Sequence, residues 1–300
     1  MVPAMSDARD PILALEPLRA VIVGMFPELA DSIFAALPGG WDSFAIDVDD
    51  RLIFKFPRRE AARTALAREA ALLAMIRPAV SLPTPDMSLH DGPPLFSRHA
   101  KLKGVFLEPA IYADLAEPAR DLIAQEIARF YAQLHALPAE AMRAAGAGPI
   151  KPWLEPDAIL ARAWPVLDET LRQYAERTVA AWCELPPDPF GVTYGFFDGH
   201  GWNMAFDAAA GRLNGVYDFG DSGFGALQQE FIYTTMISPD LTTRVIDRYS
   251  AMTGRRIEPE RVALLFAVLR LSELAEMADD AEWRPLALAA VRSLSAQPGA

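Results

Sequence analysis

Two short apolar runs near the middle of the chain constrain its fold most, because they predict a β-hairpin inside a largely helical half. "NMAFD" and "RLNGVYDF" flank "AAAG", whose glycine supplies the turn. If the residues next to the turn face each other, the same register pairs Asn203 with Val216. Asp218 then lies beside the residues just before Asn203. The hairpin therefore makes neighbours of an amide and a carboxylate that are distant in sequence.

A second carboxylate, Asp198, precedes this hairpin by one short glycine loop in "FFDGHGWNMAF". An amide oxygen and one or two carboxylates form the hard-oxygen set that Mg²⁺ prefers, with water and phosphate oxygens completing its octahedron. The alternative is that Asp198 caps a turn and Asp218 ends a strand by chance. Each residue alone favours that account, but Asp198, Asn203 and Asp218 at this spacing together favour a metal and phosphate site.

The first 105 or so residues read as a small α+β unit. They contain helical spacing over residues 11–36, strands Phe44–Val48 and Arg51–Phe56 around a tight turn, a helix over Arg59–Ile76 and a further strand before Gly104. Most of the rest is predicted to be helical, with an amphipathic helix over Ala119–Leu137, helices through residues 160–184, the hairpin region, and helices to the end.

Composition excludes several classes of function. The chain has 300 residues, 52% of them hydrophobic, and a net charge of -12, which argues against nucleic-acid binding because phosphate backbones require clustered Lys and Arg. A single cysteine, Cys183, permits no internal disulfide and suggests a reducing cytoplasmic location. No apolar run reaches the length of a membrane span, and the first residues do not resemble a signal peptide. We expect no membrane partner, and either a monomer or a homodimer.

The order Asp198-x-His200-x-x-Asn203, a hairpin and then Asp218-Phe219-Gly220 resembles the aminoglycoside phosphotransferase and choline kinase-like family of small-molecule kinases. The resemblance implies a two-lobed protein-kinase-like α+β fold, with an N-terminal nucleotide-binding lobe (residues 1–103) and a catalytic, acceptor-binding lobe (residues 104–300). It implies that Asp198 is the catalytic base and that Asn203 and Asp218 hold Mg²⁺.

The same resemblance assigns nucleotide contacts to the N-terminal lobe. Lys55 in "IFKFP" matches the family's phosphate-binding lysine, and Glu69 matches its glutamate partner, although Glu60 competes on the same helix. Phe54 and Phe56 share the face opposite Lys55, which makes a merely solvated lysine less attractive. "PGGWDSF" lies where the family's phosphate-covering loop lies, and there Ser43 is the expected donor. The backbone of the connector is expected to read the base of ATP or GTP, and its candidates are Arg98, His99 and Ala100.

Two departures from the family pattern stand out. Phe196-Phe197 replaces the family's His-Gly before the catalytic aspartate, so the loop must be held by packing, and turnover could be lowered. The second departure follows Asp221, where Glu230 is either a stand-in for the acid that buttresses the catalytic loop or a surface charge.

The acceptor is expected to be small and cationic. Residues 188–240 contain seven acids and one base, and "SELAEMADDAEW" adds five acids, although most of these charges individually fit a solvated helix face. The acids expected to contact the acceptor are Asp221, Glu230, Glu273 and Asp279. Alternatives remain a kinase of an amino alcohol, sugar or macrolide-like compound, and a catalytically weak nucleotide-binding protein.

Overall fold

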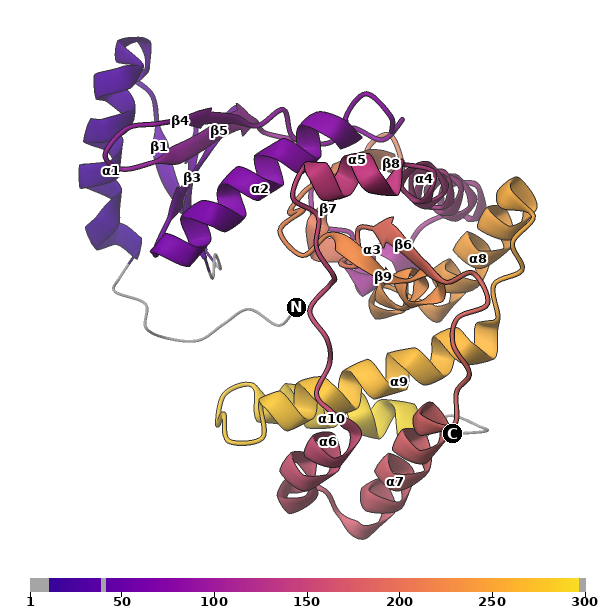
Figure 1. The fold of residues 1–300 in the computed structure, drawn as a ribbon. Helices are drawn as coiled ribbons and strands as arrows, with labels where there is room; N and C mark the ends of the chain where they lie inside the picture. The colour runs from indigo at the N-terminus through magenta and orange to yellow at the C-terminus, as the bar shows by residue number, and fades with distance from the viewer. Residues whose placement is uncertain (1–10, 39–41, 297–300) are drawn as a thin grey trace.

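A five-stranded antiparallel sheet forms the N-terminal part of the protein in the computed structural model, which describes residues 11–38 and 42–296. The order of its strands in space is β1-β2-β3-β5-β4 (Figure 1). Their bounds are β1 Phe34–Leu37, β2 Ser43–Val48, β3 Leu52–Pro57, β4 Ser88–His90 and β5 Phe96–Ala100. The sheet and the mainly helical part that follows it confirm the predicted α+β architecture.

The two faces of this sheet differ in chemistry. Phe54, Phe56 and Phe96 on one face are buried in an aromatic core with the helix α1 (Pro11–Met25). On the other face, Lys55 pairs across the strands with Ser97, and Ile53 pairs with His99. Directly opposite residues of antiparallel strands share a face. The polar side chains therefore lie together on the face turned away from the aromatic core.

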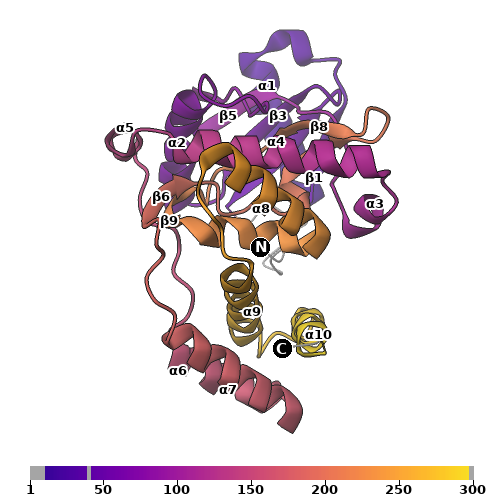
Figure 2. The same cartoon turned by 90° about the vertical axis from the view of Figure 1, so that its right-hand side faces the viewer.

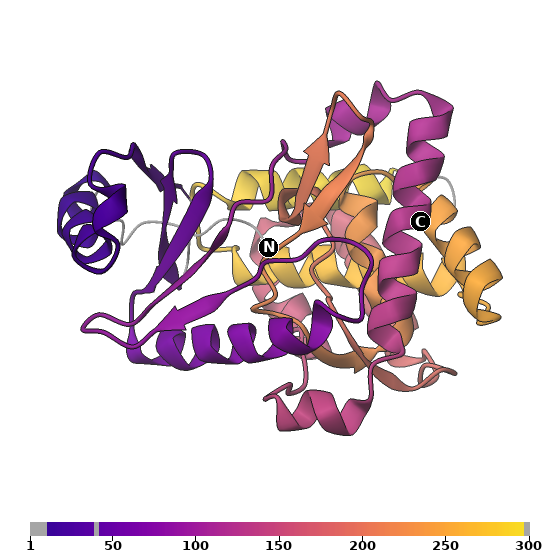
Figure 3. The same cartoon turned by 90° about the horizontal axis from the view of Figure 1, so that it is seen from above.

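The predicted turn and helix around this sheet are present, with one correction. Asp49 and Asp50 both have positive φ angles, of 56° and 53°, as two-residue hairpin turns require. The helix α2 (Glu60–Ile76) follows and runs toward the C-terminal part (Figure 3). The prediction of helix over residues 11–36 was wrong in its second half. The helix α1 ends at Met25, before Pro27, and β1 follows. Proline cannot supply the backbone N–H that would continue a helix.

Helices make up most of the C-terminal part, and Figures 1 and 2 show them in two groups. The first group surrounds two short antiparallel sheets, β6–β9 and β7–β8. The second group lies below the first in Figure 1, and two extended segments connect the groups. The first group comprises α3 Pro109–Ala113, α4 Glu117–His135, α5 Ala139–Ala144, β6 Val192–Gly195, β7 Met204–Asp207, β8 Arg212–Val216, β9 Gly223–Ala226 and α8 Pro239–Thr253. The second comprises α6 Pro156–Ala163, α7 Glu169–Cys183, α9 Pro259–Glu276 and α10 Arg284–Ser295. Short 3₁₀ turns connect these elements: η1 Pro27–Leu29, η2 Trp164–Val166, η3 Gly201–Asn203 and η4 Leu227–Met236.

The helix α9 joins the two groups because it is buried on nearly all sides. Val262, Leu265 and Phe266 belong to the large core around α4 and η4, whereas Val268 and Leu271 belong to a separate core with α6, α7 and α10. A helix that is apolar around its whole circumference is typically an interior helix. In the described part of the chain, no helix combines the length and apolar character needed to cross a membrane.

The predicted hairpin is β7–β8, and its register contains a bulge. Asp207 pairs with Arg212 as expected, but an irregularity between Ala205 and Phe206 shifts the remaining pairs by one residue. Val216 therefore pairs with Met204, and the predicted pairing with Asn203 was wrong. A bulge places one extra residue on one strand and shifts every pair beyond it.

Candidate active site

The face of the sheet turned away from the aromatic core carries Lys55, which joins the two parts of the protein. Lys55 Nζ lies 3.2 Å from Glu69 Oε1 on α2 and 3.5 Å from Asp218 Oδ1. Burial opposes the charged form of this lysine, but the two carboxylates outweigh it and raise its pKa above the usual value. Glu69 also accepts a hydrogen bond from the backbone N–H of Phe219 at 3.2 Å. The α2 glutamate thus fixes both Lys55 and the segment that carries Asp218.

A second cluster forms around Asp198, which is 5% exposed. Asn203 Nδ2 donates to Asp198 Oδ2 at 2.7 Å and to the Asp198 carbonyl at 3.1 Å. His200 Nε2 lies 3.1 Å from Asp198 Oδ1. Burial alone raises the pKa of this carboxyl, but His200 and Asn203 together hold it below its ordinary value. Asp198 is therefore a charged, oriented acceptor.

The backbone is strained beside both carboxylates. Phe197 has φ 51° and Asp218 has φ 68°, in the left-handed region that residues other than glycine rarely adopt. Such conformations persist when surrounding contacts hold them, and they concentrate at functional sites. The hydrogen bond to Glu69 holds the residue after Asp218, and two hydrogen bonds to Glu230 hold the residues before Asp198.

Glu230 is fully buried under the loop that carries Asp198. Its Oε2 accepts the backbone N–H of Phe196 at 2.9 Å, and its Oε1 accepts that of Phe197 at 2.8 Å. Of the two readings of this acid, the structure favours the buttress and argues against the surface charge. It also corrects the expectation that Glu230 contacts the acceptor, because both of its oxygens are turned into the protein interior.

Phe196 stands where the pattern that the sequence resembles has a histidine, and it is part of the core. Phe196 is 1% exposed, and its ring centroid lies 4.7 Å from that of Phe219 and 5.9 Å from that of Phe130. Aromatic pairs at these separations contribute about 0.5–1.5 kcal/mol beyond the burial of their area. The loop before Asp198 is thus held by ring packing and by the backbone contacts to Glu230.

Asn203 and Asp218 fit a magnesium ion that phosphates help to bind. The Asn203 amide nitrogen is engaged with Asp198, so its Oδ1 is the atom that could ligate a metal. The Asp218 side chain is 56% exposed. Protein sites often hold Mg²⁺ through one or two side chains, with water and substrate phosphates supplying the other oxygens. Within the described residues, no cluster of three His, Cys, Asp or Glu side chains could hold a metal by itself.

The other residues expected to contact the nucleotide do not all lie on the face of the sheet that carries Lys55. Ser43 opens β2 on the same face as Lys55, whereas Gly39, Gly40 and Trp41 of the phosphate-covering loop lie outside the described residues. The guanidinium of Arg98 lies over the Phe26 ring on the aromatic face, and its carbonyl accepts a hydrogen bond from Ser88. This placement does not favour Arg98 as a nucleotide ligand.

His99 lies on the same face as Lys55, whereas the Ala100 side chain lies on the aromatic face, opposite Leu52. His99 is 7% exposed, and its Nδ1 lies 2.9 Å from the Ala100 carbonyl. Burial lowers the pKa of His99 to about 4, assisted by the charge of Lys55 and opposed by that hydrogen bond. The His99 ring is therefore neutral at pH 7.

The remaining acceptor candidates lie on two elements. Asp221 is exposed, and desolvation together with the negative charges of Asp198 and Asp218 raises its pKa to about 6. Glu273 lies on α9, where Arg270 Nη1 is 2.6 Å from its Oε2, and Asp279 is exposed in the loop after α9. Asp221 therefore lies within electrostatic reach of the Asp198 cluster, whereas no described contact joins Asp279 to it.

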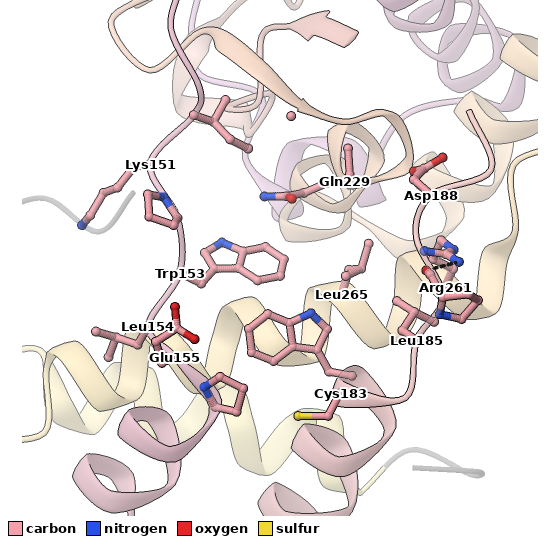
Figure 4. Close-up of a pocket in the computed structure, with 17 residues that line it drawn as sticks. Lys151, Trp153, Leu154, Glu155, Cys183, Leu185, Asp188, Gln229, Arg261 and Leu265 are labelled. Atoms are coloured by element: carbon pink, nitrogen blue, oxygen red, sulfur yellow. Dashed lines mark hydrogen bonds between the residues drawn. The ribbon is translucent and has the colours of Figure 1, made fainter. Parts of the chain in front are cut away.

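A cavity of about 570 Å³ opens between the two helical groups (Figure 4). Trp153 and Trp182 form part of its wall, with ring centroids 5.9 Å apart. The catalytic, nucleotide, metal and acceptor residues expected from the sequence are all absent from its described lining. The cavity is thus distinct from the Asp198 cluster.

The sequence analysis missed His135 and Arg68. His135 falls on the buried stripe of α4, eleven residues after Ala124 and four after Tyr131, so the helical period alone marks it as a buried histidine. Arg68 precedes Glu69 on α2, and its Nη2 donates to the Gly220 carbonyl at 2.6 Å. No pattern in the sequence marks that contact, because its partner is 152 residues away.

Comparison with known proteins agrees with this geometry. The sequence model of the phosphotransferase enzyme family, APH, matches residues 33–265. None of the curated proteins matches the chain.

Solved structures of similar fold include phosphotransferases for two classes of antibiotic. The GDP complex of wild-type aminoglycoside 2'-phosphotransferase-IIIa superposes with a TM-score of 0.80 at 22% identity, over 93% of this chain and 98% of that chain. The streptomycin–ATP–APH(2")-IIa ternary complex gives 0.63 at 18% identity, over 91% and 96%. Macrolide 2'-phosphotransferase MphH from Brachybacterium faecium gives 0.64 at 19% identity, over 91% and 97%. At these identities the similarity establishes the fold.

Proposed function

Because the chain belongs to the phosphotransferase enzyme family, we propose that it transfers the γ-phosphate of ATP or GTP to a hydroxyl group of a small cationic molecule. The observation that carries the proposal is a continuous polar path across the cleft. Glu69 contacts Lys55, Lys55 contacts Asp218, and the chain beside Asp218 is hydrogen-bonded to Asn203, which holds Asp198.

Positioning and charge neutralisation account for most of the catalysis of phosphoryl transfer. Lys55 is the cation that binds the α- and β-phosphates, and Glu69 keeps its ammonium group in place. Asn203 and Asp218 would hold Mg²⁺, which would neutralise charge on the phosphate oxygens. The rigid pairing of Lys55 with Glu69 means that the phosphate-binding charge is already oriented before the nucleotide arrives.

Asp198 accepts the proton of the attacking hydroxyl. Its charged form is maintained in a buried setting by Asn203 and His200, so it is an acceptor at neutral pH. Asn203 contacts Asp198 through its amide nitrogen and keeps its oxygen for the metal. One side chain thereby sets the position of the proposed base relative to a proposed metal ligand.

The acceptor class follows from charge. Asp221, Glu273 and Asp279 are the acids left for the acceptor once Glu230 is assigned to the interior. Solved relatives of this fold were determined with streptomycin, gentamicin or kanamycin, and others are macrolide phosphotransferases. We favour an aminoglycoside-like polyamine alcohol, because protonated amines match an acidic wall.

The decisive experiment measures phosphate transfer from Mg·ATP and Mg·GTP to a panel of aminoglycosides, amino alcohols, sugars and macrolides. Asp198→Asn should lower kcat by about 10²- to 10⁴-fold, the usual contribution of a positioned general base. Asp207→Asn is the matched control. The Asp207 carboxylate accepts hydrogen bonds from the backbone of the hairpin turn and has no assigned role in transfer. Nucleotide binding without transfer to any acceptor would refute the proposed reaction, and an unchanged rate in Asp198→Asn would refute the assigned base.

A further inference from the structure

A buried row of polar side chains leads from the surface to the loop that carries Asp198. Arg255 Nη1 lies 3.2 Å from the Tyr249 hydroxyl, which lies 2.8 Å from His135 Nδ1. His135 Nε2 lies 3.5 Å from Glu230 Oε2. The side chains of His135 and Glu230 are 1% and 0% exposed. This row connects α8 and α4 with η4, directly below the Asp198 loop.

One arrangement of protons along this row uses the donor capacity of every group. An arginine has no acceptor, so the Tyr249 oxygen accepts from Arg255, and its own proton is available to His135 Nδ1. With Nδ1 as acceptor, the ring proton of His135 is on Nε2, the nitrogen that faces Glu230. An ionised carboxylate only accepts. Glu230 accepts the two backbone N–H groups of the loop, and His135 Nε2 faces Oε2 at 3.5 Å, which is an electrostatic contact because this nitrogen has no hydrogen-bond partner.

The row places a polar side chain beside the buried Glu230 carboxylate, whose burial is energetically unfavourable. A buried carboxylate without a compensating partner is strongly destabilising. Among the described residues, no lysine or arginine forms an ion pair with Glu230, and His135 is the one basic side chain paired with it. Tyr131, one turn before His135 on α4, has a buried hydroxyl without a hydrogen-bond partner. His135 is therefore the side chain placed to orient Glu230.

We propose that His135 is a positioning residue for phosphoryl transfer, acting through Glu230 on the backbone of Phe196 and Phe197. The proposal rests on the proposed function, because the loop that it orients carries Asp198. It also accounts for the phenylalanine at position 196. Glu230, oriented by His135, accepts the backbone N–H groups of the loop. The side chain at position 196 therefore does not need to make hydrogen bonds and packs against apolar rings. The strained φ of 51° at Phe197 is the conformation that this support maintains.

The test compares two substitutions of His135 with one of its neighbour. His135→Leu removes both ring nitrogens, whereas His135→Gln retains an acceptor for Tyr249 and an N–H donor for Glu230. Leu134→Ala is the matched control, because Leu134 is fully buried on the same helix and contributes only packing. We expect His135→Leu to lower kcat by about 10- to 100-fold with an unchanged KM for the nucleotide, as a small misplacement of reacting groups does. His135→Gln should recover most of that loss. Leu134→Ala should lower Tm and leave kcat unchanged.

Backbone amide NMR signals of Phe196 and Phe197 give a readout that is independent of turnover. They should shift in His135→Leu and stay in place in Leu134→Ala. If His135→Leu does not fold, Tyr249→Phe, which removes one link of the row, should shift the same signals and lower kcat. The proposal is overturned if His135→Leu behaves like Leu134→Ala, or if glutamine is no better than leucine. If the wild-type protein transfers no phosphate, the proposed reaction fails, and the amide signals still decide whether His135 orients the loop.

Discussion

Phe196 and Phe219 pack with their ring centroids 4.7 Å apart, which ties the loop before Asp198 to the segment after Asp218. The contact joins the base and the metal-binding aspartate through apolar rings. Phe196 departs from the family pattern, whereas Phe219 follows it. Both rings are thus part of one apolar core.

Restoring histidine at this position should harm the protein. Phe196→His would bury an imidazole among Phe130 and Phe219 with no partner among the described side chains that contact it, and an unsatisfied buried polar group costs about 1–3 kcal/mol. We expect a lower free energy of unfolding in urea and no gain in kcat. Phe196→Leu is the control, because it keeps the site apolar. A stable, faster Phe196→His enzyme would show that the ring packing is not what holds the loop.

Substitution of Glu69 should lower the rate of phosphate transfer, whereas substitution of Glu60 on the same helix should not. Glu69→Gln removes the charge that pairs with Lys55, although glutamine can still accept from the Phe219 N–H. We expect kcat/KM to fall by about 10- to 100-fold, since Lys55 loses its orienting partner. Glu60→Gln on the same helix, whose partner is the exposed Arg63, should change kcat/KM by less than about twofold. Equal effects in both variants would contradict the assignment of Glu69.

Metal dependence should separate two neighbouring acids. Asp218→Asn weakens a proposed metal ligand, so the Mg²⁺ concentration for half-maximal rate should rise by about tenfold or more. Asp221→Asn, three residues later, should leave the Mg²⁺ requirement near that of the wild type and raise the KM of a cationic acceptor. Titration of each variant with Mg²⁺ at saturating nucleotide measures both effects. A Mg²⁺ requirement that responds to Asp221 and not to Asp218 would reverse the two roles.

Stability should fall with pH below neutrality because of His99. Its pKa is lowered from 6.5 to about 4 in the folded protein, so the unfolded chain binds more protons between these values. The stability contributed by the neutral ring is complete above pH 6.5 and is lost as the pH falls toward 4. From pH 7 to pH 5 we expect a loss of about 2 kcal/mol from this group. Urea unfolding of the wild type and of His99→Leu at both values should show that loss only in the wild type.

Local sequence was enough to predict the parts of the site that lie on one short segment. Asp198 and Asn203 are five residues apart, and Asp218 follows across a single hairpin, so turn chemistry brings them together. Lys55 and Glu69 lie on a strand and the next helix, fourteen residues apart. Alternation of apolar residues likewise predicted β2 and β3, because one face of each strand is buried against the aromatic core.

Contacts between distant segments were decided by the tertiary structure. The short strands β1, β6 and β9 exist through their pairing partners, and the bulge in β7–β8 follows from local packing that no residue pattern specifies. Lys55 meets Asp218 across 163 residues, and Glu230 meets Phe196 across 34. A carboxylate in a helical stretch reads equally as a surface charge or as a buried buttress. Only burial, which depends on the whole fold, made Glu230 and His135 the support of the loop that carries Asp198.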